Sequence, residues 1–150
     1  MNISIGADER KPVVVEVMEY LTKKGHMLKW HGPQRQETVP WPDVAATVAR
    51  DVASGKAHNG ILFCWTGTGV CMAANKVNGV RAALCADAET ARGARLWNDA
   101  NVLCFSLRKT SAPMAMEILE AWFSTTYQPN PDDDACLEKI KQLDTDRKTG

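Results

Sequence analysis

The sequence lacks a net charge, a long apolar run and paired cysteine motifs. Its 18 Lys and Arg residues are balanced by 18 Asp and Glu residues, so no excess positive charge is available for nucleic acid or an anionic membrane surface. No apolar run approaches the roughly 18 residues that a membrane span requires. The five cysteines lack the paired short spacings of a zinc site. We therefore expect neither a nucleic-acid nor a membrane partner.

The chain also lacks the features of a secretory signal, of internal repeats and of flexible linkers. Its first residues, 1–6, contain no basic segment followed by an apolar stretch and a small-residue cleavage site. Reduced thiols in a cytoplasmic protein are then the simplest interpretation of the cysteines. A length of 150 residues fits one core, and we expect a single domain over residues 1–150.

Apolar patterning indicates five strands that alternate with helices. Gly25 and Gly55 follow two helical stretches, Asp43 is placed to cap the second, and Ile61–Cys64 is a continuous apolar run typical of a central parallel strand. The predicted strands are 2–6, 27–30, 61–64, 80–85 and 101–105, and the predicted helices are 12–24, 43–54, 70–76, 87–97 and 111–122. This order predicts a doubly wound five-stranded parallel sheet in a Rossmann-like three-layer αβα sandwich.

After this alternation comes a C-terminal segment, 131–150. Its acidic start, Asp132–Asp134, is typical of a helix N-terminus, where negative charge is favourable. Ligands bind at the carboxyl ends of the strands in doubly wound sheets. That rule selects three segments for a site, and they are Asp8–Glu9, Cys64–Cys71, and Trp97–Asn98 together with Ser106–Arg108.

The glycine-rich turn after the central strand matches none of the common loop motifs. Met72 stands where a dinucleotide-binding fingerprint needs a third small residue, and Val70 stands where a phosphatase loop needs arginine. What remains is Cys64 beside backbone amides that favour a thiolate and that could hold a developing oxyanion. Thr66 could donate its hydroxyl to the sulfur. The alternative is that Cys64 is one more buried strand residue.

The run Gly60-Ile-Leu-Phe-Cys64-Trp-Thr-Gly-Thr-Gly-Val-Cys-Met-Ala-Ala-Asn-Lys76, followed by Gly79-Val-Arg-Ala82, resembles the signature of one family. These residues are similar to the Gly-Ile-Leu-x-Cys-Gly-Thr-Gly-x-Gly…Ala-Ala-Asn-Lys…Gly-x-Arg-Ala pattern of type B ribose-5-phosphate isomerases and galactose-6-phosphate isomerase subunits. Trp41-Pro42 and Asn98-Asp-Ala-Asn-Val-Leu103 also agree in order. The resemblance covers nearly the whole chain.

The resemblance implies a metal-free aldose–ketose isomerase that uses no cofactor and works through a cis-enediol. It implies a homodimer or higher homo-oligomer with shared active sites, and a small-molecule sugar as substrate. Cys64 matches the base and Thr66 the hydroxyl beside it. The matching substrate-binding positions are Asp8, Glu9, Trp41, Gly67, Thr68, Gly69, Val70, Cys71, Trp97, Asn98 and Arg108.

Three departures from the family pattern bear on the substrate. Trp97 stands where the family has its ring-opening histidine, and Glu9 stands where a histidine helps to bind phosphate. The C-terminal stretch 131–135 is acidic where the family carries arginines. A carboxylate repels a phosphate dianion, and indole is no acid–base group. We therefore expect a sugar other than ribose 5-phosphate, and a C-terminal helix and tail, 131–150, that pack on a partner subunit.

Two other functions stay open at this point. The chain could be a catalytically degenerate sugar-binding homologue, or the non-catalytic partner subunit of a heteromeric isomerase. It could also be a thiol redox or sulfur-transfer module built on Cys64 and Cys71, although their spacing is not that of a known redox motif.

Overall fold

A computed structural model describes residues 1–147 and shows a single five-stranded parallel sheet in the order β2-β1-β3-β5-β4. The strands are β1 (Asn2–Ala7), β2 (Met27–His31), β3 (Asn59–Cys64), β4 (Ala82–Leu84) and β5 (Val102–Ser106). The helices are α1 (Pro12–Lys23), α2 (Trp41–Ala53), α3 (Thr68–Ala74), α4 (Ala88–Asn98), α5 (Ala112–Ser124) and α6 (Pro131–Asp146). The end of the predicted tail, 148–150, lies outside the described residues.

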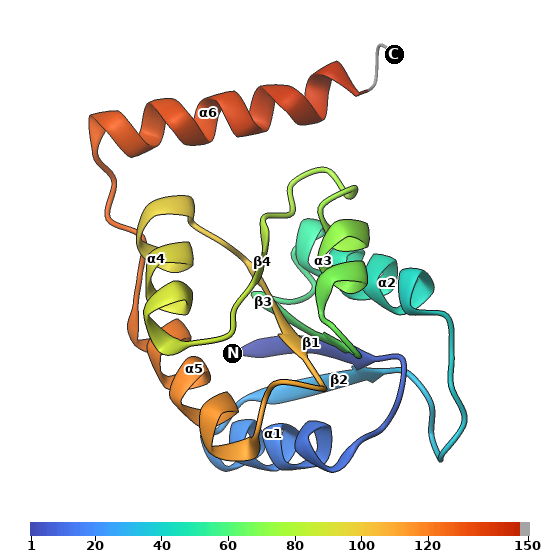
Figure 1. Ribbon diagram of the computed structural model, residues 1–150. Coiled ribbons are helices and arrows are strands. Elements are labelled where there is room, and N and C mark those ends of the chain that lie inside the picture. The colour runs from blue at the N-terminus through green and yellow to red at the C-terminus, as the bar shows by residue number, and fades with distance from the viewer. Residues whose placement is uncertain (148–150) are drawn as a thin grey trace.

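Helices cover both faces of the sheet, as a doubly wound fold requires (Figure 1). α2 and α3 pack on one face, where Val48, Leu62 and Cys104 belong to one buried cluster. α1, α4 and α5 pack on the other, where Phe63 stacks on Phe105 with ring centroids 5.0 Å apart. The predicted three-layer α/β fold is confirmed.

Two predicted boundaries are wrong for local reasons. α2 begins at Trp41 with Pro40 as its N-cap, so Asp43 lies inside the first turn and does not cap the helix. Proline suits the start of a helix because the missing N–H would be unpaired there anyway. β4 is shorter than predicted, because the side chain of Asn101 accepts the Arg81 N–H at 2.8 Å before the strand begins.

A buried carboxylate ties the last turns of α2 to the sheet. Asp51 is 6% exposed and accepts a hydrogen bond from Ser4 Oγ at 2.9 Å. His31 Nε2 lies 2.9 Å and Lys29 Nζ 3.3 Å from the same oxygen. Burial by itself raises the pKa of this carboxyl, but hydrogen bonds from His31, Ser4 and Lys29 outweigh it and hold the pKa below its ordinary value.

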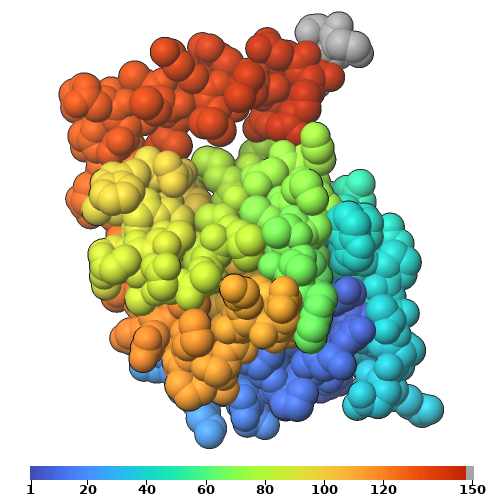
Figure 2. Space-filling model, viewed as in Figure 1, coloured from blue at the N-terminus to red at the C-terminus, as the bar shows by residue number. Residues whose placement is uncertain are grey.

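α6 differs from every other helix in that it has no buried residue. The expected acidic cap is present, since Asn130 accepts the Asp133 N–H at 2.9 Å and Asp132–Asp134 occupy the first turn. Figure 2 shows α6 as a ridge along one end of the molecule with a hollow beneath it. Ile140 and Leu143 are 47% and 56% exposed, so α6 contributes little to the core of its own chain.

Candidate active site

Cys64 is the last residue of β3, at the carboxyl edge of the sheet. Its carbonyl accepts the Leu107 N–H at 2.9 Å, which continues the pairing of Cys64 with Ser106 between β3 and β5. The side chain belongs to the α2–α3 core cluster and is 5% exposed. The sulfur therefore lies just beneath the surface, at the place where the sequence predicts the base.

The turn that follows Cys64 has a fixed shape. Gly67 has φ +76°, and a Cβ there would lie 2.5 Å from Leu84 Cδ1 and 2.8 Å from Phe105 O, so only glycine fits. The hydroxyls of Thr66 and Thr68 lie 2.7 Å apart, so Thr66 is paired with Thr68 rather than with the sulfur of Cys64. Thr68 starts α3.

Of the remaining loop residues, Gly69 is covered by an indole ring, whereas the side chains of Val70 and Cys71 point inward. A Cβ on Gly69 would lie 3.0 Å from Cε3 of Trp41, so the indole of Trp41 lies directly over the loop. Val70 is fully buried, and Cys71 points toward β4, with its Sγ 3.5 Å from the Ala82 carbonyl. Backbone atoms of the turn and the Trp41 ring, rather than these two inward side chains, are thus available to a ligand.

Asp8 supplies a polar group at the same edge, directly after β1. Its Oδ1 is buried and has no hydrogen-bond partner among residues 1–147. Burial raises the pKa of this carboxyl above its ordinary value, and the charge of Glu9 raises it further. A buried acceptor without a donor is costly, and a ligand hydroxyl would satisfy it. Glu9 itself is paired with Lys11 at 3.0 Å.

Arg108 and Trp65 complete the carboxyl edge. The Arg108 N–H donates to the Trp65 carbonyl at 3.0 Å, and Ser106 Oγ donates to the same oxygen at 3.1 Å. These bonds fix the backbone of Trp65, whose side chain is 60% exposed. Trp65 is not among the predicted site residues, although its place next to Cys64, where the family pattern has glycine, was the available signal.

The predicted placement of Trp97 and Asn98 at this edge is wrong for a single chain. They end α4, which runs back to the amino edge of the sheet before β5 begins. In the register of the sheet, the first residue of β5, Val102, pairs with Gly60, and the last, Ser106, pairs with Cys64. Gly60 and Cys64 are four residues apart along β3, so the two edges of the sheet are separated by about 13 Å. Both side chains are exposed there, Trp97 at 60%.

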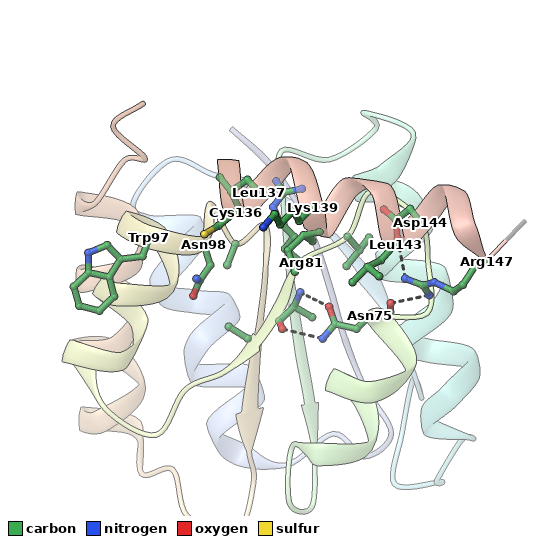
Figure 3. Close-up of a pocket in the computed structure, with 15 residues that line it drawn as sticks. Asn75, Arg81, Trp97, Asn98, Cys136, Leu137, Lys139, Leu143, Asp144 and Arg147 are labelled. Atoms are coloured by element: carbon green, nitrogen blue, oxygen red, sulfur yellow. Dashed lines mark hydrogen bonds and ion pairs between the residues drawn. The ribbon is translucent and has the colours of Figure 1, made fainter. Parts of the chain in front are cut away.

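Asn98 and Trp97 instead line a cavity of about 600 Å³ between α6 and the body of the protein. Figure 3 shows Cys136, Leu137 and Lys139 reaching into this space from α6. At the far end, Arg147 donates to the Asn75 carbonyl at 3.1 Å, and Asp144 accepts the Gly79 N–H at 2.8 Å (Figure 3 draws the Arg147 contact). The helix is thus held to its own chain by polar contacts around a cavity.

The carboxyl edge thus combines a cysteine, a glycine-rich turn, an unpaired carboxylate oxygen and exposed indoles. Within residues 1–147, no three His, Cys, Asp or Glu side chains gather as metal ligands would. None of the helices in this range is long and apolar enough to cross a membrane. The fold defines a doubly wound α/β protein, a class in which ligands bind at the carboxyl edge of the sheet, and these groups form the candidate site there.

Comparison with known proteins narrows this class to one family. The model of the family described as Ribose/Galactose Isomerase matches residues 3–140, and the chain belongs to this family of sugar-phosphate isomerases. The predicted family and enzyme class are confirmed. The chain is 38% identical over 130 residues to the D-erythrulose-4-phosphate isomerase of Pectobacterium atrosepticum, which covers 85% of this chain and 86% of the relative.

Two further relatives are similar in sequence to nearly the whole of this chain. A galactose-6-phosphate isomerase subunit of Clostridium acetobutylicum is 35% identical over 144 residues, covering 95% of this chain and 83% of that one. The solved ribose-5-phosphate isomerase B of Clostridium thermocellum has a TM-score of 0.93 and 34% identity, covering 98% of this chain and 99% of that one. The relatives thus differ in the sugar that their names give.

Proposed function

We propose that the chain is an aldose–ketose isomerase that works through a cis-enediolate with Cys64 as its base, on a sugar or sugar derivative other than ribose 5-phosphate. The observation that carries the proposal is the position of Cys64, which ends the central strand directly before a turn whose shape only glycine allows. Asp8 adds an unpaired buried acceptor at the same edge. These groups offer a proton acceptor, backbone donors and a partner for a sugar hydroxyl.

The chemistry follows from these groups. The Cys64 thiolate takes the proton from C2 of an open-chain aldose, and the electron pair of that bond forms the enediolate while negative charge develops on O1. Backbone N–H groups of the turn stabilise this oxyanion. A proton moves from O2 to O1, and the Cys64 thiol returns its proton to C1 to give the ketose. Cys64 is 5% exposed, so a substrate has to displace atoms around the turn to reach the sulfur.

The proposed preference for a sugar other than ribose 5-phosphate is based on Glu9 and on the indole rings of Trp41 and Trp65. Glu9 stands where the family uses a histidine for phosphate, and its pairing with Lys11 at 3.0 Å offsets part of its repulsion toward an anion. Trp41 and Trp65, 40% and 60% exposed, offer flat apolar surfaces for a sugar face. The names of two relatives give erythrulose 4-phosphate and galactose 6-phosphate, so members of this family act on sugars other than ribose 5-phosphate.

We propose a homodimer with shared sites, and the separation of the two edges supports it. If Asn98 and Trp97 contact the substrate, they have to come from a second copy, because their own chain places them about 13 Å from the level of Cys64. The apolar residues of α6, Ile140 and Leu143, are exposed as expected of a helix that packs on a partner. A second copy would thus complete the site and cover α6.

A specific observation favours a second candidate function, a non-catalytic sugar-binding subunit. Trp97 replaces the acid–base residue that opens the sugar ring in the family pattern, and indole cannot transfer a proton in that role. One relative is itself named as a subunit of its enzyme. In this case Asp8 and the indoles would bind a sugar that Cys64 does not convert.

Exchange of the hydrogen that the enediol route moves distinguishes the two functions. The purified protein is incubated in D2O with ribose 5-phosphate, erythrulose 4-phosphate and the corresponding free sugars, and deuterium at C2 of an aldose or at C1 of a ketose is followed by NMR. The isomerase proposal expects exchange with at least one sugar, lost in Cys64→Ser and kept in the matched control Cys85→Ala, whose thiol lies in the opposite core. Exchange with no sugar, together with saturable binding, would favour the binding subunit.

Glu9 provides the test of substrate preference. Removing its charge in Glu9→Gln is expected to lower KM for a phosphorylated sugar about tenfold, since one like-charge contact near the surface is worth on the order of 1 kcal/mol. KM for the unphosphorylated sugar should stay within twofold. Equal changes for both sugars would show that Glu9 does not face the phosphate position.

A further inference from the structure

The carboxamide of Asn75 pairs with the backbone of β4. Its Nδ2 donates to the Ala82 carbonyl at 2.9 Å, and its Oδ1 accepts the Ala82 N–H at 2.8 Å (Figure 3). Asn75 directly follows the last residue of α3, and Ala82 is the first residue of β4. The two hydrogen bonds therefore join the end of the helix to the start of the strand. Both are partly buried, which shields them from water.

This pairing lies on the open side of an edge strand. β4 is at one end of the strand order, next to β5. The Arg81 carbonyl accepts the Asn101 N–H at 3.0 Å on the side of β5. The C=O and the following N–H of a trans peptide point in opposite directions, so the Ala82 N–H points away from β5. The Asn75 carboxamide thus takes the place that a further strand would take, and it satisfies both backbone groups of Ala82.

α3 needs directional contacts of this kind to be held in one position. It has seven residues, and its buried side chains are those of Val70 and Ala74. A helix this short is unstable by itself. Two small apolar side chains do not prevent it from sliding along its axis, because apolar burial is not directional. Hydrogen bonds have a preferred distance and angle, so the Asn75 pair can fix the helix relative to β4.

The other end of β4 packs against the glycine-rich turn. A Cβ on Gly67 would lie 2.5 Å from Leu84 Cδ1, so the Leu84 side chain lies directly beside the turn. Leu84 is the last residue of β4, and Gly67 directly precedes α3. The turn, α3 and β4 are therefore held together at two places, by Leu84 at one end and by Asn75 at the other. Loss of the Asn75 pair is expected to release the end of α3 and to shift the turn.

We propose that Asn75 is a positioning residue, which acts through α3 to fix the backbone of the glycine-rich turn. This inference rests on the proposed function, in which the same backbone stabilises the charge of the enediolate. In this role Asn75 does not contact the sugar. Its loss lowers kcat more than it raises KM, because the misplaced donors act on charge that develops only in the transition state.

Asn78 supplies a matched control on the loop that follows α3. Its Nδ2 donates to the Asp144 carbonyl at 3.2 Å, so this carboxamide contacts α6 and not β4. Asn75→Ala is expected to lower kcat about 10- to 100-fold and to leave KM within about threefold, whereas Asn78→Ala should keep kcat within about twofold. Steady-state kinetics on a sugar that the unmodified chain converts measures both constants. The proposal is overturned if Asn75→Ala keeps its kcat, or if its KM rises as much as its kcat falls.

Asn75→Asp separates a positioning role from a purely structural one. A protonated carboxyl offers an O–H donor and a carbonyl acceptor, so it can replace both hydrogen bonds to Ala82. An ionised carboxylate only accepts, and it would face the Ala82 carbonyl. Because burial and this carbonyl favour the protonated form, the kcat of the variant relative to that of the unmodified chain should be roughly fivefold higher at pH 5 than at pH 8. A constant ratio in folded protein would contradict the proposal.

A spectroscopic test does not require isomerase activity. The backbone amide resonances of Gly67 and Gly69 in proton–nitrogen NMR spectra report on the conformation of the turn. Both should shift in Asn75→Ala and stay in place in Asn78→Ala. If the unmodified chain converts no sugar, the proposed function fails, and these resonances still decide whether Asn75 positions the turn.

Unchanged resonances of both glycines in Asn75→Ala would overturn the proposal. Where this variant does not fold, the nearly isosteric Asn75→Asp at pH 8 provides the same comparison.

Discussion

The two edges of the same sheet carry opposite kinds of surface. At the carboxyl edge, Cys64 is 5% exposed under a closely packed turn, and Trp41 lies over Gly69. At the amino edge, a cavity of about 600 Å³ opens between α6 and the body, and Trp97 is 60% exposed beside it. The carboxyl edge thus holds the groups of the proposed chemistry, and the amino edge holds the cavity with Trp97 and Asn98. If all of these residues serve one site, as proposed above, a single chain keeps its two halves apart.

The largest expected effect comes from removing the proposed base at the carboxyl edge. Cys64→Ser should lower kcat about 10³-fold, the usual contribution of a positioned proton-transfer group. Stability should change by less than about 1 kcal/mol, because the substitution is nearly isosteric. Steady-state kinetics and urea unfolding measure the two quantities. A variant that keeps more than a tenth of the activity would place the base elsewhere.

Mixing two damaged chains tests whether the half-sites meet across an interface. Cys64→Ser damages one edge and Asn98→Ala the other, so a mixed dimer contains one site with both changes and one intact site. After joint refolding, activity should rise to about a quarter of the unmodified value, as random pairing in a two-fold dimer predicts. An activity equal to the average of the two separate variants would mean that each chain acts alone.

Truncation of one leucine on α5 and one on α6 compares how much each helix contributes to stability. Leu119 on α5 is fully buried, and Leu119→Ala should cost about 3 kcal/mol in the free energy of unfolding. Leu143 on α6 is 56% exposed, and Leu143→Ala should change the stability of a separated chain by less than about 0.5 kcal/mol. Urea unfolding at low protein concentration measures both, and sedimentation shows whether Leu143→Ala weakens association. Equal destabilisation would contradict the exposed position of α6.

The smallest expected effect concerns Asp8 and has opposite signs for stability and activity. Because the folded state holds the pKa of Asp8 above its ordinary value, the protonated form is favoured, and stability is lost as the pH rises through that pKa. Asp8→Asn should therefore raise the free energy of unfolding at pH 7 by about 1 kcal/mol, while substrate affinity falls. Unfolding curves at pH 4 and pH 7 check this, since the gain should shrink at the lower pH.

The sequence predicts the frame of the molecule well and the contacts of the site only in part. Five apolar strands and their helices follow from local periodicity, and Cys64 at a strand end follows from the same pattern. The prediction that Trp97 lies at the carboxyl edge is wrong. A helix between two parallel strands returns to the amino edge of the sheet, so the last residues of α4 lie far from the proposed site. The contact of Trp41 with Gly69 joins residues 28 positions apart, and the empty acceptor of Asp8 depends on burial by other elements. Local patterns cannot contain such information.

α2 connects the site to a carboxylate at its other end. Its first residue, Trp41, is the indole over the glycine-rich turn, and Asp51 sits ten positions later, about 15 Å along the helix axis. Because its pKa is depressed in the folded state, Asp51 stabilises the protein at neutral pH, and this contribution disappears as acid protonates it. Acidification would weaken the contacts that hold the C-terminal end of α2 to the sheet, while the first residue of this helix covers Gly69 in the turn. An acid sensitivity of the proposed catalysis would then arise at a carboxylate outside the proposed site.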